Sequence, residues 1–357
     1  MKSATLNRRW PHRCGLLLSI ALVAPTVHAA PTTEALHREA VGVRAPGQAV
    51  LLGAAQAWTR IVAVGERGIV ALSDDGGRKW RQASVPASVT LTAVRFADAD
   101  HGWAVGHGGT VLASDDAGQH WTRQLDGRQA AQAVLEAARA SGDAPAVKSA
   151  ERLVADGPDK PLLDLLLLGG QRLLVVGSYG LALASEDGGR SWVSWSARLT
   201  NPKGLHIYAA RLRGSVVLLA GEQGLAMLST DGGRSFRPLD TPYKGSFFTA
   251  ELLGESDIVL AGLRGNVLRS QDGGATWVSI PAPMPASFTA SALDGDGTLL
   301  LANQAGWVMT LDGDRLLPLA KTTLGPLNGL LPRVGAAPLA LTVRGAQPVT
   351  TTSGPSK

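Results

Sequence analysis

Five segments of the chain share the pattern Ser-x-Asp-x-Gly-x-x-aromatic, and this repetition is the feature that most constrains the fold. The serines of the five copies are 41, 71, 44 and 41 residues apart, and a sixth, degenerate copy runs through Thr310, Asp312 and Asp314. The five copies span residues 73–80, 114–121, 185–192, 229–236 and 270–277. A motif that returns about every 40 residues indicates a row of similar structural units.

A second marker precedes each copy and sets the number of units. It is a Gly-x-x-Gly turn, which occurs at residues 65–68, 106–109, 177–180, 221–224 and 262–265. Residues 303–306 and 342–345 fit as a sixth and a seventh turn, although each lacks the first glycine. Seven turns predict seven units.

Each unit has the sequence character of four short strands. In the second unit we expect strands at residues 92–96, 102–106, 110–114 and 121–124, because β-branched and apolar residues alternate there between Gly and Asp. Units of about 40 residues with four antiparallel strands are typical of propeller blades. The sequence therefore predicts an all-β fold, a seven-bladed β-propeller over residues 30–350. We expect residues 36–43 to supply the outer strand that the last blade lacks.

The repeated motif, called the Asp-box below, is interpreted as part of the architecture. Its aspartate can accept backbone N–H bonds across a turn, its glycine permits a positive φ, and its aromatic residue can pack between blades. Equivalent aspartates at five turns cannot all be catalytic. Calcium binding is the alternative for these residues, which are Asp75, Asp116, Asp187, Asp231 and Asp272.

The alternation of strand directions predicts that the Asp-boxes lie on one face and the Gly-x-x-Gly turns on the other. We call these the Asp-box face and the turn face; the turn face also includes the connections between blades. Variable polar residues at the turn tips of a rigid ring favour a binding surface. The alternative is that they are solvated turn residues. The candidate partner-binding residues are Arg67, His107, Tyr179, Arg264 and Arg344.

The 71-residue spacing marks an insertion between the second and third blades, at residues 127–160. Its segments 129–140 and 146–155 are rich in alanine and carry apolar residues at helical spacing, which predicts two short helices. We expect them to cover the mouth of the channel or to contact a partner. A tolerated decoration of a loop is the alternative.

The N-terminus has the features of a secretory signal peptide over residues 1–29. A basic segment precedes the short apolar stretch 14–24, and small residues follow it. An uncleaved membrane anchor is the alternative. The leader contains four basic residues and no acidic one, so the remaining chain has a formal net charge of +1 rather than +5. Cys14, the one cysteine, lies in the leader. These observations predict a periplasmic or secreted protein with no nucleic acid partner, and residues 351–357 are expected to form a disordered tail.

The repeats resemble those of the bacterial neuraminidase repeat superfamily. The segment 262–277, with the sequence GLRGNVLRSQDGGATW, is most similar to the photosystem II stability/assembly factor family in its non-photosynthetic bacterial branch. The resemblance covers residues 48–350. It implies a non-enzymatic scaffold or assembly factor, peripheral to the membrane, whose partner is a membrane protein complex or an envelope transporter. An arginine patch is implied as well, and Arg67, Arg264 and Arg344 are the positions that match it.

A glycan-binding protein or a sialidase-like glycoside hydrolase is the alternative function. A sialidase needs an arginine triad and an early Phe/Tyr-Arg-Ile-Pro motif, whereas residues 59–62 read Thr-Arg-Ile-Val. A hydrolase of another type needs two neighbouring carboxylates. Glu66 and Glu222 belong to the first and fourth units, and Asp164 has no evident carboxylate partner. We therefore expect no catalytic residues, no metal and no cofactor.

Overall fold

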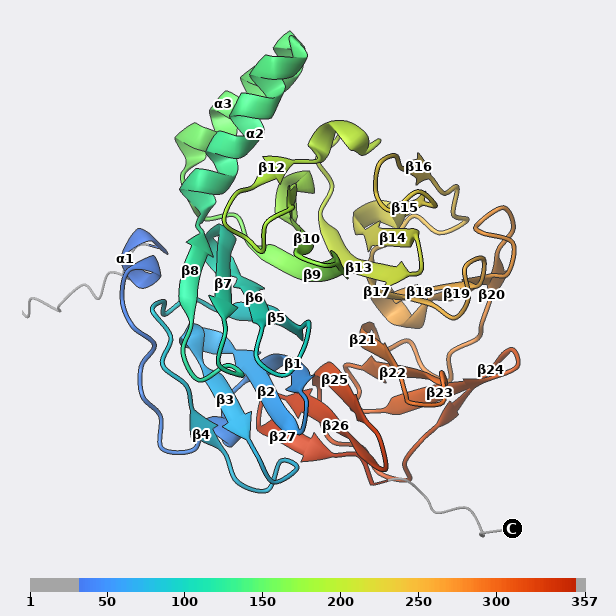
Figure 1. Cartoon of the computed structure of the whole chain (residues 1–357). Coiled ribbons are helices and arrows are strands. Elements are labelled where there is room, and N and C mark those ends of the chain that lie inside the picture. The colour runs from blue at the N-terminus through green and yellow to red at the C-terminus, as the bar shows by residue number, and fades with distance from the viewer. Residues whose placement is uncertain (1–31, 351–357) are drawn as a thin grey trace, which may run out of the picture. The chain divides into compact units, whose positions relative to one another are not determined.

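The computed structural model describes residues 32–350, which are mostly β-structure. The predicted leader, residues 1–29, and the predicted tail, residues 351–357, lie outside the described residues. Seven separate antiparallel sheets follow one another along the chain, and each places its strands side by side in sequence order (Figure 1).

The first three sheets contain four strands each. They are β1 Leu51–Ala57, β2 Arg60–Gly65, β3 Val70–Ser73 and β4 Arg81–Gln82; β5 Leu91–Phe96, β6 Gly102–Gly106, β7 Thr110–Ser114 and β8 Thr122–Leu125; and β9 Leu162–Gly169, β10 Arg172–Gly177, β11 Ala182–Ser185 and β12 Val193–Ser194. The strands expected in the second unit match β5 to β8 to within one residue at each end.

The last four sheets also contain four strands each, except the seventh, which has three. Their strands are β13 Ile207–Arg213, β14 Val216–Gly221, β15 Ala226–Ser229 and β16 Arg237–Pro238; β17 Phe247–Leu252, β18 Ile258–Gly262, β19 Val267–Ser270 and β20 Val278–Ser279; β21 Phe288–Leu293, β22 Leu299–Asn303, β23 Val308–Asp312 and β24 Arg315–Pro318; and β25 Leu327–Arg333, β26 Ala336–Thr342 and β27 Gly345–Pro348.

The seven sheets are arranged as blades around a centre (Figure 1). The first strand of each sheet contacts the first strand of the next, and β25 of the last sheet contacts β1 of the first. This arrangement is consistent with a seven-bladed β-propeller, in which β1, β5, β9, β13, β17, β21 and β25 are the innermost strands. A ring of this kind buries both faces of every blade between its neighbours.

The prediction that every blade has four strands was wrong, because the seventh sheet has three. Residues 36–43 do not add a strand to it. Leu36, which ends the short helix α1 Thr32–Leu36, is buried in the core between the first and second blades, and the N–H of Ala40 donates to the carbonyl of Val85 at 3.0 Å. The segment instead runs beside the connection that joins those two blades.

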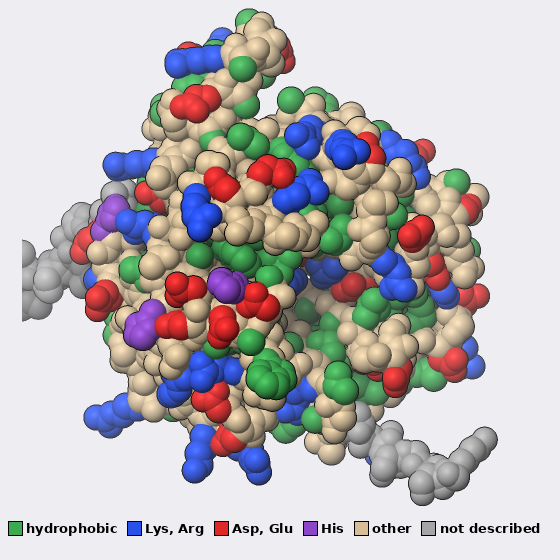
Figure 2. Space-filling model, in the orientation of Figure 1, with side chains coloured by type: hydrophobic (Ala, Val, Ile, Leu, Met, Phe, Trp, Pro, Cys, Tyr) green, Lys and Arg blue, Asp and Glu red, His purple; other side chains and the backbone are tan. Residues whose placement is uncertain are grey.

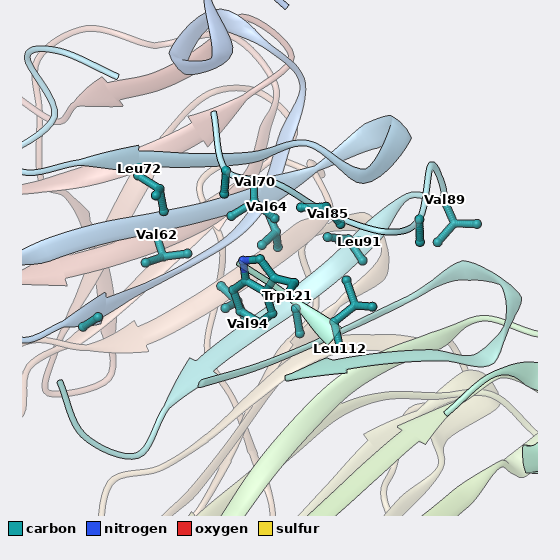
Figure 3. Close-up of a cluster of buried hydrophobic side chains, with 14 of the residues drawn as sticks. Val62, Val64, Val70, Leu72, Val85, Val89, Leu91, Val94, Leu112 and Trp121 are labelled. Carbon is teal, nitrogen blue, oxygen red and sulfur yellow. The ribbon is translucent and has the colours of Figure 1, made fainter. Parts of the chain in front are cut away.

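Apolar side chains fill the space between adjacent blades. Between the first and second blades, valines and leucines from β2, β3, β5 and β7 surround Trp121, the aromatic residue of the second Asp-box (Figure 3). Its indole N–H donates to the carbonyl of Gly118 in the same box at 2.9 Å. The Asp-box thus supplies a large buried side chain whose polar atom is satisfied within the motif.

The fourth copy shows how an Asp-box turn is held. The hydroxyl of Ser229 donates to the carboxylate of Asp231 at 2.7 Å and accepts from the N–H of Gly233 at 2.9 Å. The same carboxylate accepts from the N–H groups of Arg234 and Ser235 at 2.9 and 3.0 Å. These bonds satisfy the backbone of a tight turn locally, so the aspartate is fully occupied by its own loop.

Residues 127–160 contain two antiparallel helices, α2 Gly127–Ser141 and α3 Ala144–Asp156. Asp126 caps the first helix by accepting from the N–H groups of Arg128 and Gln129. The helices pack on each other, and α2 also contacts β12 and the turn at residues 107–109. They project outward from the ring (Figure 1), so the expectation that they cover the channel mouth was wrong. No helix within residues 32–350 is long and apolar enough to cross a membrane.

Candidate functional site

The innermost strand of every blade contains a β-bulge near its start. In β13, for example, Ile207 pairs with Gly221 and Ala209 with Ala220, so Tyr208 has no partner in the ladder. The same shift occurs in the other six innermost strands. A bulge re-aims the extra side chain, and the seven bulge residues all line one cavity at the centre of the ring. We call them the bulge ring: Leu52, Thr92, Leu163, Tyr208, Phe248, Thr289 and Asn328.

Close backbone neighbours explain two of the glycines that mark the turns in the sequence. At Gly65, which has an extended backbone, a Cβ atom would lie 1.9 Å from the carbonyl oxygen of Val50, just before the first innermost strand. Gly345 has a φ of +96°, and a Cβ there would lie 1.9 Å from the carbonyl oxygen of Gly47. The Gly-x-x-Gly turn is therefore held between backbone segments on both sides.

Three members of the bulge ring connect neighbouring blades. The hydroxyl of Thr92 donates to the carbonyl of Leu162 at 2.8 Å, and that of Thr289 to the carbonyl of Leu327 at 2.6 Å. The amide of Asn328 donates to the carbonyl of Leu51 at 3.1 Å, which joins the seventh blade to the first. These contacts join the second blade to the third, the sixth to the seventh, and the seventh to the first.

The bulge residues of the third, fourth and fifth blades are apolar or aromatic, and two of them extend a row of rings. The ring of Phe248 lies 5.4 Å from that of Tyr208, the ring of Tyr208 lies 6.1 Å from that of His206, and the ring of His206 lies 5.2 Å from that of Tyr179. We call these four residues the aromatic path. It runs from the tip of the third blade on the turn face to the central cavity.

Charged groups hold the outer half of the aromatic path. The ammonium of Lys160, at the base of the helical insertion, lies 5.1 Å from the centre of the Tyr179 ring. Glu222 accepts from the backbone N–H of His206 at 3.1 Å, and its carboxylate is 3.2 Å from the imidazole. Burial, together with the charge of Glu222, raises the pKa of the Tyr208 phenol, so this hydroxyl stays neutral.

A chain of ion pairs crosses the central cavity below the bulge ring. A guanidinium nitrogen of Arg95 lies 3.2 Å from one carboxylate oxygen of Asp164, and Arg211 lies 2.7 Å from the other. Arg211 also contacts Glu251 at 2.9 Å, and Glu251 accepts from the hydroxyl of Ser291 at 2.8 Å. The cavity holds about 130 Å³, and Figure 2 shows a hollow with charged side chains at the centre of the ring.

Arg211 is the centre of this ionic chain. Burial alone would lower the pKa of its guanidinium, but the charges of Glu251 and Asp164 more than offset that effect, so its pKa lies above the ordinary value. The interpretation that Asp164 lacks a carboxylate neighbour was incomplete, because Asp164 and Glu251 share one arginine. Sequence reasoning missed this group, although charged residues within otherwise apolar innermost strands were a signal for it.

The structure places the five candidate residues at the tips of the turns between the second and third strands, where all are exposed. Arg67, Tyr179 and Arg264 occupy equivalent positions and have φ values of 56°, 55° and 57°. His107 stands one position earlier in its turn, beside Gly108. Tyr179 alone joins the aromatic path. Because the tips belong to different blades, the structure does not gather the three arginines into one contact network.

No group of three or more His, Cys, Asp or Glu side chains within residues 32–350 could hold a metal ion. The carboxylates of the five Asp-boxes accept hydrogen bonds from their own turns instead.

Comparison with known proteins places this architecture in a family. The model of the family described as Photosynthesis system II assembly factor YCF48 matches residues 72–148 and 146–300, which together are well over half of the chain. The chain belongs to this family. No curated protein shows significant similarity to it.

Two solved structures with TM-scores above 0.5 share the fold of this YCF48-family chain. YCF48 from Cyanidioschyzon merolae is 16% identical, with a TM-score of 0.61 over 85% of this chain and 96% of that one. The WD40 β-propeller domain of Doa1 is 9% identical, with a TM-score of 0.57 over 87% and 94%. A structure of YCF48 bound to D1 peptide is 18% identical with a TM-score of 0.43, and the match covers 50% of this chain and 59% of that one.

Proposed function

We propose that this chain is a non-enzymatic periplasmic scaffold that binds a membrane protein complex, such as an envelope transporter, and assists its assembly. The proposal depends on one combined observation. A member of the assembly-factor family exposes Arg67, Tyr179 and Arg264 at equivalent positions of a rigid ring, each in the left-handed backbone region. Residues other than glycine adopt that region at a cost, and such positions are concentrated at binding sites.

The charge of the turn face supports a protein partner with acidic groups. Arg67, Arg264 and Arg344 are exposed there, together with Lys203 and Lys244 in the connections between blades. Electrostatic complementarity between charged surfaces speeds association and selects the partner. On the Asp-box face, the repeated aspartates accept hydrogen bonds within their own turns.

Hydrolysis of glycans is not proposed, because the central carboxylates are unsuited to it. A glycosidase needs one carboxyl group that is held protonated as the acid and a second that is free to act as base or nucleophile. Asp164 and Glu251 both pair with Arg211, so neither carboxylate is free to act as the base or nucleophile.

Charge reversal tests the partner-binding face. The double variant Arg67→Glu/Arg264→Glu should lose most of the membrane complex that copurifies with the tagged protein after mild cross-linking. The matched control is Arg234→Glu, an exposed arginine in an Asp-box on the opposite face, which should retain it. Unchanged recovery with a folded double variant would refute the site. Turnover of a sialoside or another glycan by the purified protein would refute the non-enzymatic assignment.

Export can be tested separately. Residues 1–29 fused to alkaline phosphatase, an enzyme that is active only after export, should give activity in the periplasmic fraction. A cytoplasmic, inactive fusion would contradict the proposed location.

A further inference from the structure

We propose that the aromatic path is a docking groove for one aromatic side chain of an extended, acidic segment of the partner, and that this side chain stacks on Tyr208 and Phe248 at the mouth of the central cavity. The inference rests on the proposed function, because it specifies how the turn face recognises its partner. It adds a second recognition element to the exposed arginines, one that uses shape and stacking rather than charge.

The bulge ring provides an internal comparison for this assignment. Seven side chains occupy the same structural position, and three of them, Thr92, Thr289 and Asn328, bond to the backbone of the next blade. Tyr208 and Phe248 stand in neighbouring blades at the same position and contact each other edge to face at 5.4 Å. Both are only partly buried, so their rings are available at the mouth of the cavity.

The cavity beyond this pair is lined by charged and polar groups, so the aromatic pair belongs to the apolar part of its mouth. Leu163, Tyr208 and Phe248 come from three consecutive blades and lie together on one side of that mouth. Arg95 of the ionic chain lies deeper, with a side chain that is 36% exposed. Its guanidinium can contact the face of a ring that stacks on the pair.

The outer end of the path carries an aromatic side chain that the turn itself does not require, since Arg67, Gln223 and Arg264 occupy the same left-handed position in other blades. Tyr179 is 59% exposed and adopts a φ of 55°, a conformation that is unusual for a bulky residue. The equivalent position of the second blade is Gly108, which adopts a positive φ without strain. The tyrosine therefore adds a fixed aromatic surface between the helical insertion and the cavity.

The surrounding charges determine the character of the segment. Lys203 lies beside Gly204, which approaches the backbone of Tyr179. Lys244, in the connection that leads into Phe248, pairs with the exposed Asp240 at 3.6 Å. Arg264 is at the tip of the fifth blade. Within the path itself, Glu222 is paired with His206 and Lys160 with Asp156 and Asp159. An extended segment with one aromatic residue and acidic flanks is complementary to this pattern.

A random dodecapeptide library displayed on phage is the probe. Selection on the full chain should enrich peptides that contain an aromatic residue flanked by Asp or Glu, and synthetic copies should bind in solution. Phe248→Ser and, independently, Tyr179→Asn should each weaken binding of these peptides at least tenfold. Asparagine tolerates the positive φ, so Tyr179→Asn tests recognition without disturbing the fold. Trp58→Ser, which removes an aromatic side chain that is 81% exposed at the hairpin joining β1 to β2, is the matched control and should bind normally.

The outcomes separate this inference from the proposed function. Enriched peptides without an aromatic residue, equal binding by Tyr179→Asn and the natural chain, or no enrichment at all would overturn the docking groove. Each of these results is compatible with loss of copurification in Arg67→Glu/Arg264→Glu, in which case the scaffold role stands without the groove. Peptide binding that persists while no membrane complex copurifies would support the groove and refute the scaffold.

Discussion

Replacement of Arg211 by methionine tests whether the central ionic chain holds the ring together. The side chain is 17% exposed and pairs with two carboxylates that are 8% and 9% exposed. Removing one member of a buried ion pair typically destabilises a protein by about 3–5 kcal/mol, because the partner charge stays buried. In the variant, Asp164 is still paired with Arg95, whereas the remaining partner of Glu251 in the ionic chain is the hydroxyl of Ser291. We therefore expect a loss near the lower end, about 3 kcal/mol.

Urea unfolding at pH 7 measures this loss, and two further substitutions check its cause. Arg211→Met/Glu251→Gln should recover part of the lost stability, because the amide leaves no buried charge without a partner. Arg95→Met, which removes a more exposed partner, should cost less. A free energy of unfolding for Arg211→Met within about 1 kcal/mol of the natural chain, or no recovery in the double variant, would refute the reasoning.

Three further predictions follow from the turns and the insertion. Hydrogen bonds from the hydroxyl and N–H of Ser191 lower the pKa of Asp187 from 3.8 to about 2. The stability that the Asp187 carboxylate contributes is therefore complete above pH 4 and lost as the pH falls through 2. A thermal melting temperature that stays constant over this pH range would contradict the prediction. Gly345→Ala should reduce the free energy of unfolding in urea by more than about 2 kcal/mol, because a Cβ atom there would lie 1.9 Å from a backbone oxygen. Such strain exceeds the usual effect of a Gly-to-Ala substitution, which is roughly 1 kcal/mol. Gly335→Ala is the control: its Cβ would meet nothing within 4 Å, and it should lose only about 1 kcal/mol. Replacement of residues 128–157 by a short Gly/Ser linker should remove the helical circular dichroism signal and leave the β signal, since no residue of the insertion lines the central cavity; unfolding of the whole chain would contradict this.

The sequence was informative wherever local patterning decides the structure. Alternation and the regular Gly-x-x-Gly turns predict the strands, because a propeller blade is built from neighbours along the chain. Residues 36–43 show the limit of such reasoning. Their pattern allows a strand but cannot say which edge they meet, and burial of Leu36 between the first two blades decided against the seventh.

The central cavity lay beyond prediction for a different reason. Arg95, Asp164, Arg211 and Glu251 come from four blades, and only closure of the ring brings them together. The direction in which each side chain points depends on the bulges, since a shift of one residue turns a strand's side chains to the other side. No local signal in the sequence marks those bulges. The Asp-boxes, which are the easiest motif to recognise, have aspartates that are bonded within their own turns.

The seven bulges have a consequence for how a partner can be oriented. Around the mouth of the cavity, the seven innermost strands repeat the same bulge, so this part of the backbone alone gives a bound chain no preferred rotation. At each bulge, however, the side chain can differ from one unit to the next without a change in the backbone. The bulge residues of the second, sixth and seventh units bond to the backbone of the next blade. Those of the fourth and fifth units are aromatic. The side chains therefore make the mouth of the cavity asymmetric, although the innermost strands repeat, and a segment that enters the mouth can bind in a single rotational setting.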